Sequence, residues 1–361
     1  MDADELIRIY RESLSDIRWE GPTNPERIKQ YKHVWPSEEE FIKDVEHRPT
    51  GVLMEEFTDQ WLTRIKDYVV SRNPGLSEES GKAILVPINS FAQFTGTRML
   101  HGGVPLILVD SGLMKFIWVM NKALVYGQDS GEFSRNHLTC MTLLMYAIYL
   151  RPPERLKREI PDLSFSTPPT PPHSDKSTLI SLTFETWLHE LFVIAHEIAH
   201  IELGHLTKGA GGARGSFTPL PVSPLASVFV KDVSSVEEEL AADDLALDLC
   251  IEAVLKGEHS AGTRDIVQRI LTSIYQASRY FLWLEMVLKA DAGEAELPWA
   301  ARHFQLRSKI DSVYKWGSPT FIADHLDWLE ENMEPGAFRA AELYNDLLTE
   351  EERSNGGGGS T

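Results

Sequence analysis

Apolar residues recur at helical spacing along most of this chain, and short apolar runs interrupt that pattern near residue 100. Apolar side chains three and four residues apart share one face of a helix, so this spacing predicts helices. The runs Ala83–Ile88 and Val104–Val109 are instead typical of strands. Helices are predicted at residues 4–17, 52–70, 111–125, 133–150, 178–206, 235–256, 264–290, 298–316, 321–332 and 337–351. The sequence therefore predicts an α+β protein that is mainly helical, with a small sheet.

Three stretches carry no such periodicity. Residues 89–103, between the two predicted strands, are rich in turn-forming residues. Residues 151–177 are rich in proline, and residues 208–233 combine glycine with proline, so neither is predicted to be regular helix or central strand. Because irregular segments of this length are usually functional or disordered, we expect one of them to cover a cleft. The final residues, 355–361, are interpreted as a linker or tag.

Composition narrows the class of protein. The 361 residues are 42% hydrophobic and carry a formal net charge of −19, from 35 basic and 54 acidic side chains. This acidic balance argues against nucleic acid and anionic membrane surfaces as partners. No apolar run is long enough to span a bilayer, and no secretory signal is recognisable. With only two cysteines, Cys140 and Cys250, a reducing and cytoplasmic location is expected.

The motif HEIAH at residues 196–200 carries the candidate chemistry. Residues four apart lie on one face of a helix, so His196 and His200 can bind the same ion through their imidazoles. A zinc ion lowers the pKa of a bound water to about 7, and Glu197 beside the histidines can then take its proton. A catalytic zinc site needs a third protein ligand, which this motif does not supply.

The next strong helix offers that third ligand. His205 follows His200 by five residues, whereas the metzincin pattern requires six, so its spacing does not fit. Glu239 and Asp243 are four residues apart and share a helical face. Glu239 can complete a His, His, Glu set. Asp243 can accept a hydrogen bond from the second ring nitrogen of a zinc-bound histidine.

Several other residues remain open candidates. His189 lies about two turns before His196 on a similar face, so it is either a cleft residue or a structural histidine. His205 is either a cleft residue or a favourable charge at the helix C-terminus. Attack of a metal-bound water on a carbonyl would also need a group that stabilises the negative charge of the tetrahedral intermediate. The sequence does not choose among the candidates for that group, which are Tyr275, Tyr280, His205 and Arg302.

The motif HEIAH followed by Glu239-Leu-Ala-Ala-Asp243 resembles the HExxH plus ExxAD signature of gluzincin zinc metallopeptidases. The likeness is to the soluble, minigluzincin type, related to HtpX and the CAAX proteases. Asn89-Ser-Phe-Ala92 resembles the NAFA stretch of that family, and Gly112 to Met114 its Gly-Leu-Met helix start. Leu297-Pro298 and Arg302 resemble a later His-Pro and Arg pattern, but Leu297 stands where the family has histidine. HEIAHIELGH also resembles the ImmA/IrrE-type peptidases.

The resemblance implies a zincin-like metallopeptidase core at residues 81–313, with insertions at 127–177 and 207–234. An N-terminal helical region at 1–80 and C-terminal helices at 314–354 would flank it. The resemblance also implies one Zn²⁺ held by His196, His200 and Glu239, with Glu197 as general base and Asp243 behind the ligands. The strand Val104–Val109 would be a sheet edge that pairs with an extended substrate.

The expected function is therefore that of a zinc-dependent endopeptidase acting on a protein or peptide substrate. The second resemblance points to a bacterial stress or phage-defence setting. Two alternatives stay open: a zinc hydrolase of another class, and a regulatory or binding protein with a structural metal site. The oligomeric state is not predicted. Replacing Glu197 by glutamine separates an enzyme from a structural metal protein, because Glu197 is not a ligand.

Overall fold

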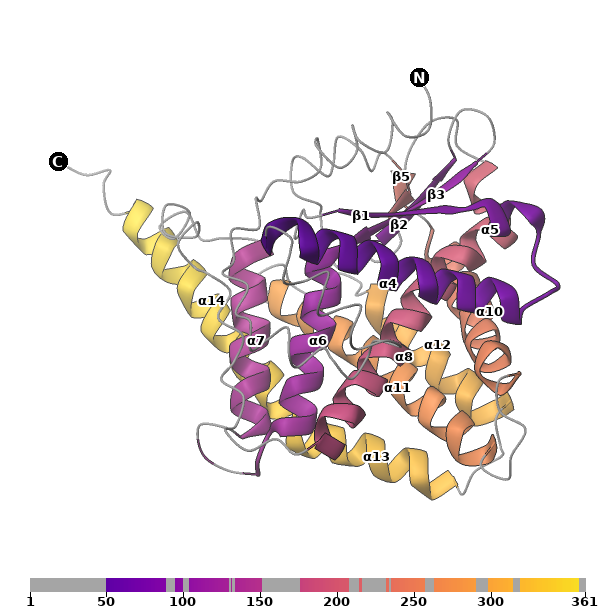
Figure 1. Ribbon diagram of the computed structural model, residues 1–361. Coiled ribbons are helices and arrows are strands. Elements are labelled where there is room, and N and C mark those ends of the chain that lie inside the picture. The colour runs from indigo at the N-terminus through magenta and orange to yellow at the C-terminus, as the bar shows by residue number, and fades with distance from the viewer. Residues whose placement is uncertain are drawn as a thin grey trace.

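Helices make up most of the computed structural model, and a small sheet lies at one end of it, at the top of Figure 1. The α+β, mainly helical class is thereby confirmed. The structure describes residues 50–88, 95–99, 104–129, 131, 134–150, 176–207, 214–215, 232–233, 235–256, 263–289, 298–313 and 319–356. The helix predicted at residues 4–17 lies outside these ranges.

The described helices follow the predicted pattern with small shifts at their ends. None of them is both long and apolar enough to cross a membrane. The short helix α5 was not predicted; its N-cap Ser77 accepts a hydrogen bond from the backbone of Ser80. The helices are α4 (Thr50–Arg72), α5 (Glu78–Lys82), α6 (Ser111–Tyr126), α7 (Arg135–Leu150), α8 (Lys176–Glu202), α10 (Val236–Leu255), α11 (Thr263–Leu288), α12 (Pro298–Val313), α13 (Pro319–Asn332) and α14 (Glu334–Gly356), with a 3-10 turn, η3, at His205–Thr207.

Within the described residues the sheet has five strands, in the order β1-β3-β2-β4-β5. Strand β3 pairs in parallel with β1 and antiparallel with β2, and β2 pairs antiparallel with β4. The prediction that the strand near Val104–Val109 is an edge is therefore wrong. All six residues of β3 are buried, and a continuous apolar run of this kind is typical of a central strand. The strands are β1 (Ile84–Ile88), β2 (Thr95–Met99), β3 (Pro105–Asp110), β4 (Arg214–Gly215) and β5 (Asp232–Val233).

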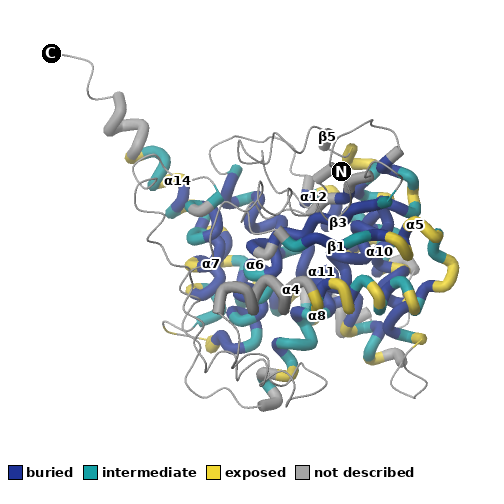
Figure 2. Tube along the Cα trace, turned by 45° about the horizontal axis from the view of Figure 1, so that its top comes forward, coloured by how far each residue is buried: buried dark blue, intermediate teal, exposed yellow. Residues whose placement is uncertain are grey.

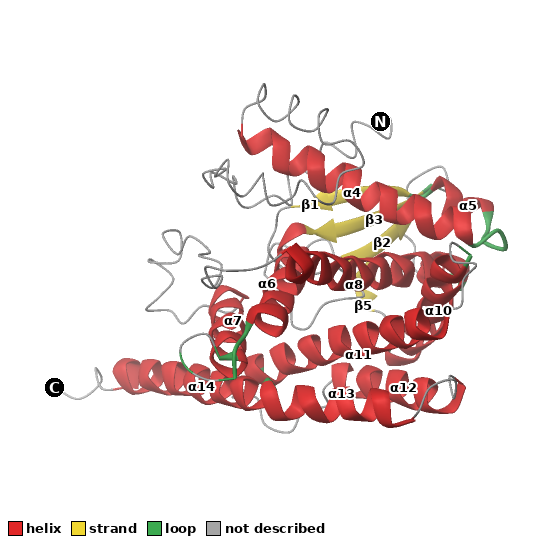
Figure 3. Cartoon of the chain, turned by 60° about the horizontal axis from the view of Figure 1, so that its bottom comes forward, coloured by secondary structure: helices red, strands yellow, loops and turns green. Residues whose placement is uncertain are grey.

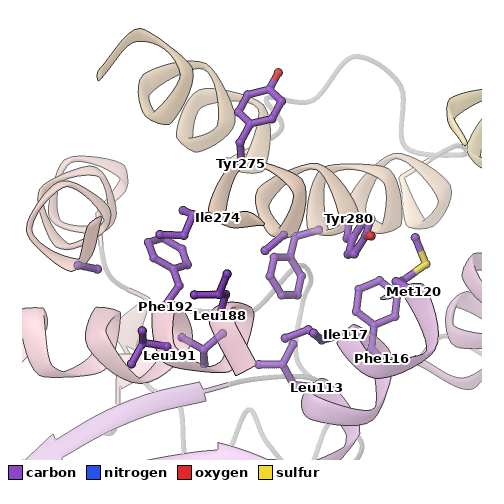
Figure 4. Packing of buried hydrophobic residues seen from close by; sticks show 14 of the residues in the cluster. Leu113, Phe116, Ile117, Met120, Leu188, Leu191, Phe192, Ile274, Tyr275 and Tyr280 are labelled. Atoms are coloured by element: carbon purple, nitrogen blue, oxygen red, sulfur yellow. The ribbon is translucent and has the colours of Figure 1, made fainter. Parts of the chain in front are cut away.

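Helix α8 is the centre of the helical layer. It packs against α10, α6, α4 and α11, and its second half is buried on every side. Figure 2 shows these inner helices as almost continuously buried, with exposed positions along the outer side of α4 and α5. Close to the middle of the core, apolar side chains of α6, α8 and α11 meet, among them Phe116, Leu188 and Ile274 (Figure 4). A helix with such surroundings can keep ionisable side chains only if they have partners.

Packing is continuous across the domain boundaries predicted at residues 80 and 314. Helix α4 packs against β1, α8 and α10, and Figure 3 shows it along the sheet on the side away from α11. At the other end of the chain, α14 packs along α7, which lies inside the predicted insertion at 127–177. Leu62 of α4 and Tyr344 of α14 belong to the same apolar core. The described residues thus share one core.

Candidate metal centre

Two helices bring the candidate ligands together. The second half of α8 carries His196 and His200, which are 0% and 3% exposed. Helix α10 begins with a capping box, in which Ser235 and Glu238 satisfy each other's backbone groups. This cap fixes the first turn of α10, and Glu239 follows it directly at 8% exposure. The long packed interface between α8 and α10 therefore sets the positions of all three side chains.

The distances among these three residues fit a single metal ion. Nε2 of His196 lies 3.0 Å from Nε2 of His200 and 3.2 Å from Oε2 of Glu239. Nε2 of His200 lies 3.4 Å from Oε1 of Glu239. A tetrahedral zinc ion with bonds of about 2.0–2.1 Å separates its ligand atoms by about 3.3–3.4 Å. His196, His200 and Glu239, called the ligand cluster below, are thus close enough to bind one ion.

The carboxylate of Glu239 supports this interpretation independently. Both of its oxygens are buried, and within the described part of the chain neither has a donor in good hydrogen-bond geometry. Its nearest cationic atom is Nη1 of Arg302, at 3.0 Å from Oε2. A buried carboxylate is costly unless it is bonded or coordinates a metal. The donor set of two imidazoles and one carboxylate is one that zinc accepts.

Asp243 and Arg302 form a second layer behind the ligand cluster. Oδ1 of Asp243 lies 2.8 Å from Nδ1 of His196, the ring nitrogen that faces away from Glu239. Arg302 donates two hydrogen bonds to the same carboxylate, from Nε to Oδ2 and from Nη2 to Oδ1, each at 2.7 Å. Its guanidinium also lies over the ring of Trp299, 3.9 Å from the centroid. Arg302, a predicted candidate for oxyanion stabilisation, is thus engaged with Asp243 and Glu239.

The charges of this layer move several pKa values. Burial alone would lower the pKa of His196, but the negative charge of Asp243 and the carboxylate oxygens of Asp243 and Glu239 beside the ring outweigh it and raise that pKa to about 9. Burial would raise the pKa of Glu239 and of Asp243, yet Arg302 and His196 lower both. A proton on His196 and a metal ion compete for the same ring nitrogen, so metal binding here must release protons.

Glu197 lies at the junction of α8 with the sheet. It is fully buried, and the hydroxyl of Thr97 donates a hydrogen bond of 2.5 Å to its Oε2. Burial lowers the pKa of Arg302, but the charges of Asp243 and Glu239 and, to a lesser extent, that of Glu197 raise it. Thr97 belongs to β2, which the sequence did not predict, so no sequence signal identified this residue. Thr97 thus brings a side chain of β2 into contact with Glu197.

His205 and His189 lie on different sides of the ligand cluster. His205 begins the turn η3 and is 6% exposed; its Nδ1 lies 2.8 Å from Nδ1 of His200. It is therefore behind a ligand, instead of in an open cleft. His189 is fully buried next to Asn121, whose amide nitrogen lies 3.1 Å from its Nδ1. The structure thus gives His189 polar partners within the core.

The two tyrosine candidates for oxyanion stabilisation lie among other neighbours in the core. The hydroxyl of Tyr280 donates to Asn121 and accepts from Gln276, at 3.2 and 2.8 Å. Tyr275 packs against His303, with ring centroids 4.2 Å apart, and in Figure 4 its hydroxyl points away from Leu188 and Phe192 of α8. Among the described residues, neither of these contacts places a tyrosine hydroxyl beside Glu197.

No family model matches this chain, and the searches of curated proteins and of solved structures also return no match. The resemblance to gluzincin peptidases therefore stays a prediction. One of its motifs, residues 89–92, lies outside the described residues, as does Leu297. The functional argument consequently rests on the geometry of the ligand cluster and its neighbours.

Proposed function

We propose that this protein is a zinc-dependent endopeptidase that uses the ligand cluster and Glu197. The observation that carries the proposal is the spacing of 3.0, 3.2 and 3.4 Å among the ligand atoms, which suits a tetrahedral ion. Imidazole and carboxylate ligands, with Asp243 behind His196, are the arrangement expected of a zinc site. Three protein ligands leave the fourth position for water or substrate, as catalytic zinc requires.

Glu197 is the proposed general base. A bound zinc ion would polarise the scissile carbonyl and lower the pKa of water to about 7. The Glu197 carboxylate then takes the proton of the attacking water and later gives it to the leaving amine. Thr97 donates a hydrogen bond to Oε2 of Glu197 and thereby holds this carboxylate in one orientation. Burial of Glu197 excludes bulk solvent, so this proton is passed between fixed groups.

A peptide is favoured over other substrates because an extended segment of the protein itself lies beside Glu197. Gly96 and Thr97 of β2 pair antiparallel with Gly215 and Arg214 of β4, and the hydroxyl of Thr97 contacts Glu197. Since β2 is flanked by β3 and β4, a substrate would pair with this part of β2 by taking the place of β4. In this proposal β2 takes the substrate-binding role that the sequence assigned to Val104–Val109.

The proposal is tested by measuring bound metal and peptide cleavage on the same samples. Wild type should hold about one zinc per chain, and His196→Ala and Glu239→Ala should hold none, because two ligands bind zinc weakly. Glu197→Gln should keep its zinc while cleavage of an unstructured protein such as casein falls by about 10²–10⁴-fold. Asp244→Asn, on the exposed side of α10, is the matched control and should change neither quantity.

Each result has a defined meaning. Wild-type protein without stoichiometric metal, even after zinc is supplied, would contradict the proposal. Zinc retention with full function of Glu197→Gln would instead indicate a structural metal site. Cleavage of small esters or amides without cleavage of any polypeptide would indicate a zinc hydrolase of another class.

A further inference from the structure

His200 and His205 form a buried imidazole pair at the end of α8. Their Nδ1 atoms are 2.8 Å apart, and the ring centroids are 5.0 Å apart with the planes inclined at 63°. At this distance one Nδ1 atom carries a proton and the other accepts it, because two lone pairs or two protons would repel. The other nitrogen of His200, Nε2, faces His196 and Glu239. One ring of the pair is thus a candidate ligand, and the other lies behind it.

The direction of this hydrogen bond decides whether His200 can bind a metal. If His205 donates, the neutral His200 ring carries its proton on Nε2, where the ion must bind. If His200 donates from Nδ1, its Nε2 lone pair is free and directed at Glu239. Only the arrangement in which His200 donates from Nδ1 leaves its Nε2 able to bind the ion of the ligand cluster. His205 must then carry its own proton on Nε2 and offer the lone pair of Nδ1.

We propose that His205 is a positioning residue for the metal: its Nδ1 accepts the Nδ1–H of His200 and thereby fixes the orientation and the tautomer of that ligand. The inference rests on the zinc site of the proposed function and goes beyond it, because it assigns a role to a residue outside the HExxH and ExxAD motifs. His205 does not share the ion, since it bonds to the ring nitrogen of His200 on the side away from Glu239.

The turn that carries His205 is built to hold it there. Helix α8 ends at Glu202, and Gly204 adopts a φ of 66°, a left-handed conformation that suits glycine. Backbone bonds from Leu203 to Ala199 and from Gly204 to Ile201 close the turn. The carboxylate of Glu202 accepts the backbone N–H of Ser77 at 2.8 Å, which ties the end of α8 to the start of α5. His205 is thereby brought back against His200.

A neutral acceptor behind His200 has an electrostatic reason. His196 is backed by the carboxylate of Asp243, which is itself paired with Arg302. A second carboxylate behind His200 would place another buried anion beside Glu239, and such a charge is costly without a cation of its own. An imidazole accepts the hydrogen bond without adding charge. His196 is therefore oriented by a carboxylate, and His200 by a neutral imidazole.

The test compares zinc affinity in three variants by competition with a chromophoric chelator. His205→Phe keeps a ring but has no acceptor, and its zinc dissociation constant should rise about 10–100-fold, as for loss of other groups that orient a metal ligand. His205→Asn puts an oxygen near the position of Nδ1 and should recover most of the affinity. His189→Phe is the matched control, because it also replaces a buried histidine by phenylalanine. Among the described residues, His189 contacts no member of the ligand cluster. The zinc affinity of His189→Phe should equal that of wild type.

Nitrogen-15 spectra of the histidine rings in wild-type protein with zinc give a readout independent of any variant. We expect the ring of His200 with its proton on Nδ1 and metal on Nε2, and the ring of His205 with its proton on Nε2. Unchanged zinc affinity in His205→Phe, or a metal-bound nitrogen on His205, would overturn the inference while leaving the zinc site intact. Wild type that binds no zinc would overturn both the inference and the proposed function.

Discussion

The two buried histidines His189 and His196 lie about two turns apart on the same helix, yet they differ in charge state. Burial lowers the pKa of His189 to about 4 and outweighs the opposing contributions of Glu185 and of the Ser273 backbone. The pKa of His196 is raised to about 9, because Asp243 and Glu239 outweigh the same effect of burial. Equal burial on one helix therefore leads to a neutral ring at one position and a cationic or metal-bound ring at the other.

The partners of the two rings explain this difference. His189 belongs to a polar cluster of uncharged groups: Asn121 donates to Thr186 and contacts Nδ1 of His189, and Tyr280 and Gln276 donate to the Asn121 carbonyl. His196 instead faces two carboxylates and a nearby guanidinium. Uncharged partners stabilise a fold, whereas opposed charges around a ring also prepare it to exchange a proton for a metal ion.

The largest expected effect comes from removing the charge behind His196. In Asp243→Asn the buried guanidinium of Arg302 loses its negative, bidentate partner, and His196 keeps at most a neutral amide oxygen in place of the carboxylate that orients its ring. We expect the free energy of unfolding to fall by about 3–5 kcal/mol, as when one partner of a buried ion pair is removed. Zinc affinity should fall about 10–100-fold. Denaturant unfolding and chelator competition measure the two quantities.

Asp244→Asn is the matched control for that change, one residue along α10. Asp244 pairs with Lys309 at 2.9 Å, and its side chain is 49% exposed, so its loss should cost about 1 kcal/mol or less. Equal effects of the two substitutions would mean that Asp243 acts as an ordinary ion-pair residue and that the contrast between the two histidines is not functional.

A smaller effect is expected from a change in the polar cluster around His189. In Asn121→Leu the polar cluster loses its centre, so Tyr280 and His189 keep buried polar atoms without that partner. The free energy of unfolding should fall by about 1–3 kcal/mol. Zinc content should stay at the wild-type value, because Asn121 contacts no member of the ligand cluster among the described residues. Loss of zinc in this variant would show that the two regions are coupled.

The last prediction concerns the pH dependence of stability in metal-free protein. The pKa of His196 is raised on folding, so its contribution is present below the ordinary value of about 6.5 and is lost as pH rises through about 9. The pKa of His189 is lowered, so its contribution is present above about 6.5 and is lost as pH falls through about 4.

Thermal unfolding of wild type, His196→Gln and His189→Gln between pH 4 and 9 measures both contributions. The difference between wild type and His196→Gln should shrink toward pH 9, and that between wild type and His189→Gln should shrink toward pH 4. Parallel changes for both variants would contradict the assigned environments.

The helices and the ligand cluster were accessible from sequence, because both depend on local spacing. Four-residue spacing within HEIAH and between Glu239 and Asp243 predicts shared faces, and the structure brings these residues together. Contacts between side chains of different helices were harder to predict from the sequence. Arg302 was a candidate for oxyanion stabilisation, but its position depends on how α12 packs against α10, which no local pattern encodes.

The sheet was the least accessible part. Strand β2 has the sequence TGTRM, which lacks the alternation of apolar residues that predicts a strand. It forms because β3 offers a buried partner on that side, and β4 adds to it from a segment more than a hundred residues away in sequence. The wrong prediction that β3 is an edge strand and the failure to identify Thr97 both follow from not recognising β2 as a strand.

The stacking of Arg302 on Trp299 gives the protein an optical reporter of its own. The guanidinium lies 3.9 Å from the centroid of that indole ring and also contacts Glu239, so a dication bound by Glu239 changes the charge next to the chromophore. Indole emission depends on nearby charge, and Trp299 is 1% exposed, which shields it from solvent quenching. Titration with zinc can thus be followed by fluorescence without a label, and Trp299→Phe identifies the part of the signal that comes from this site.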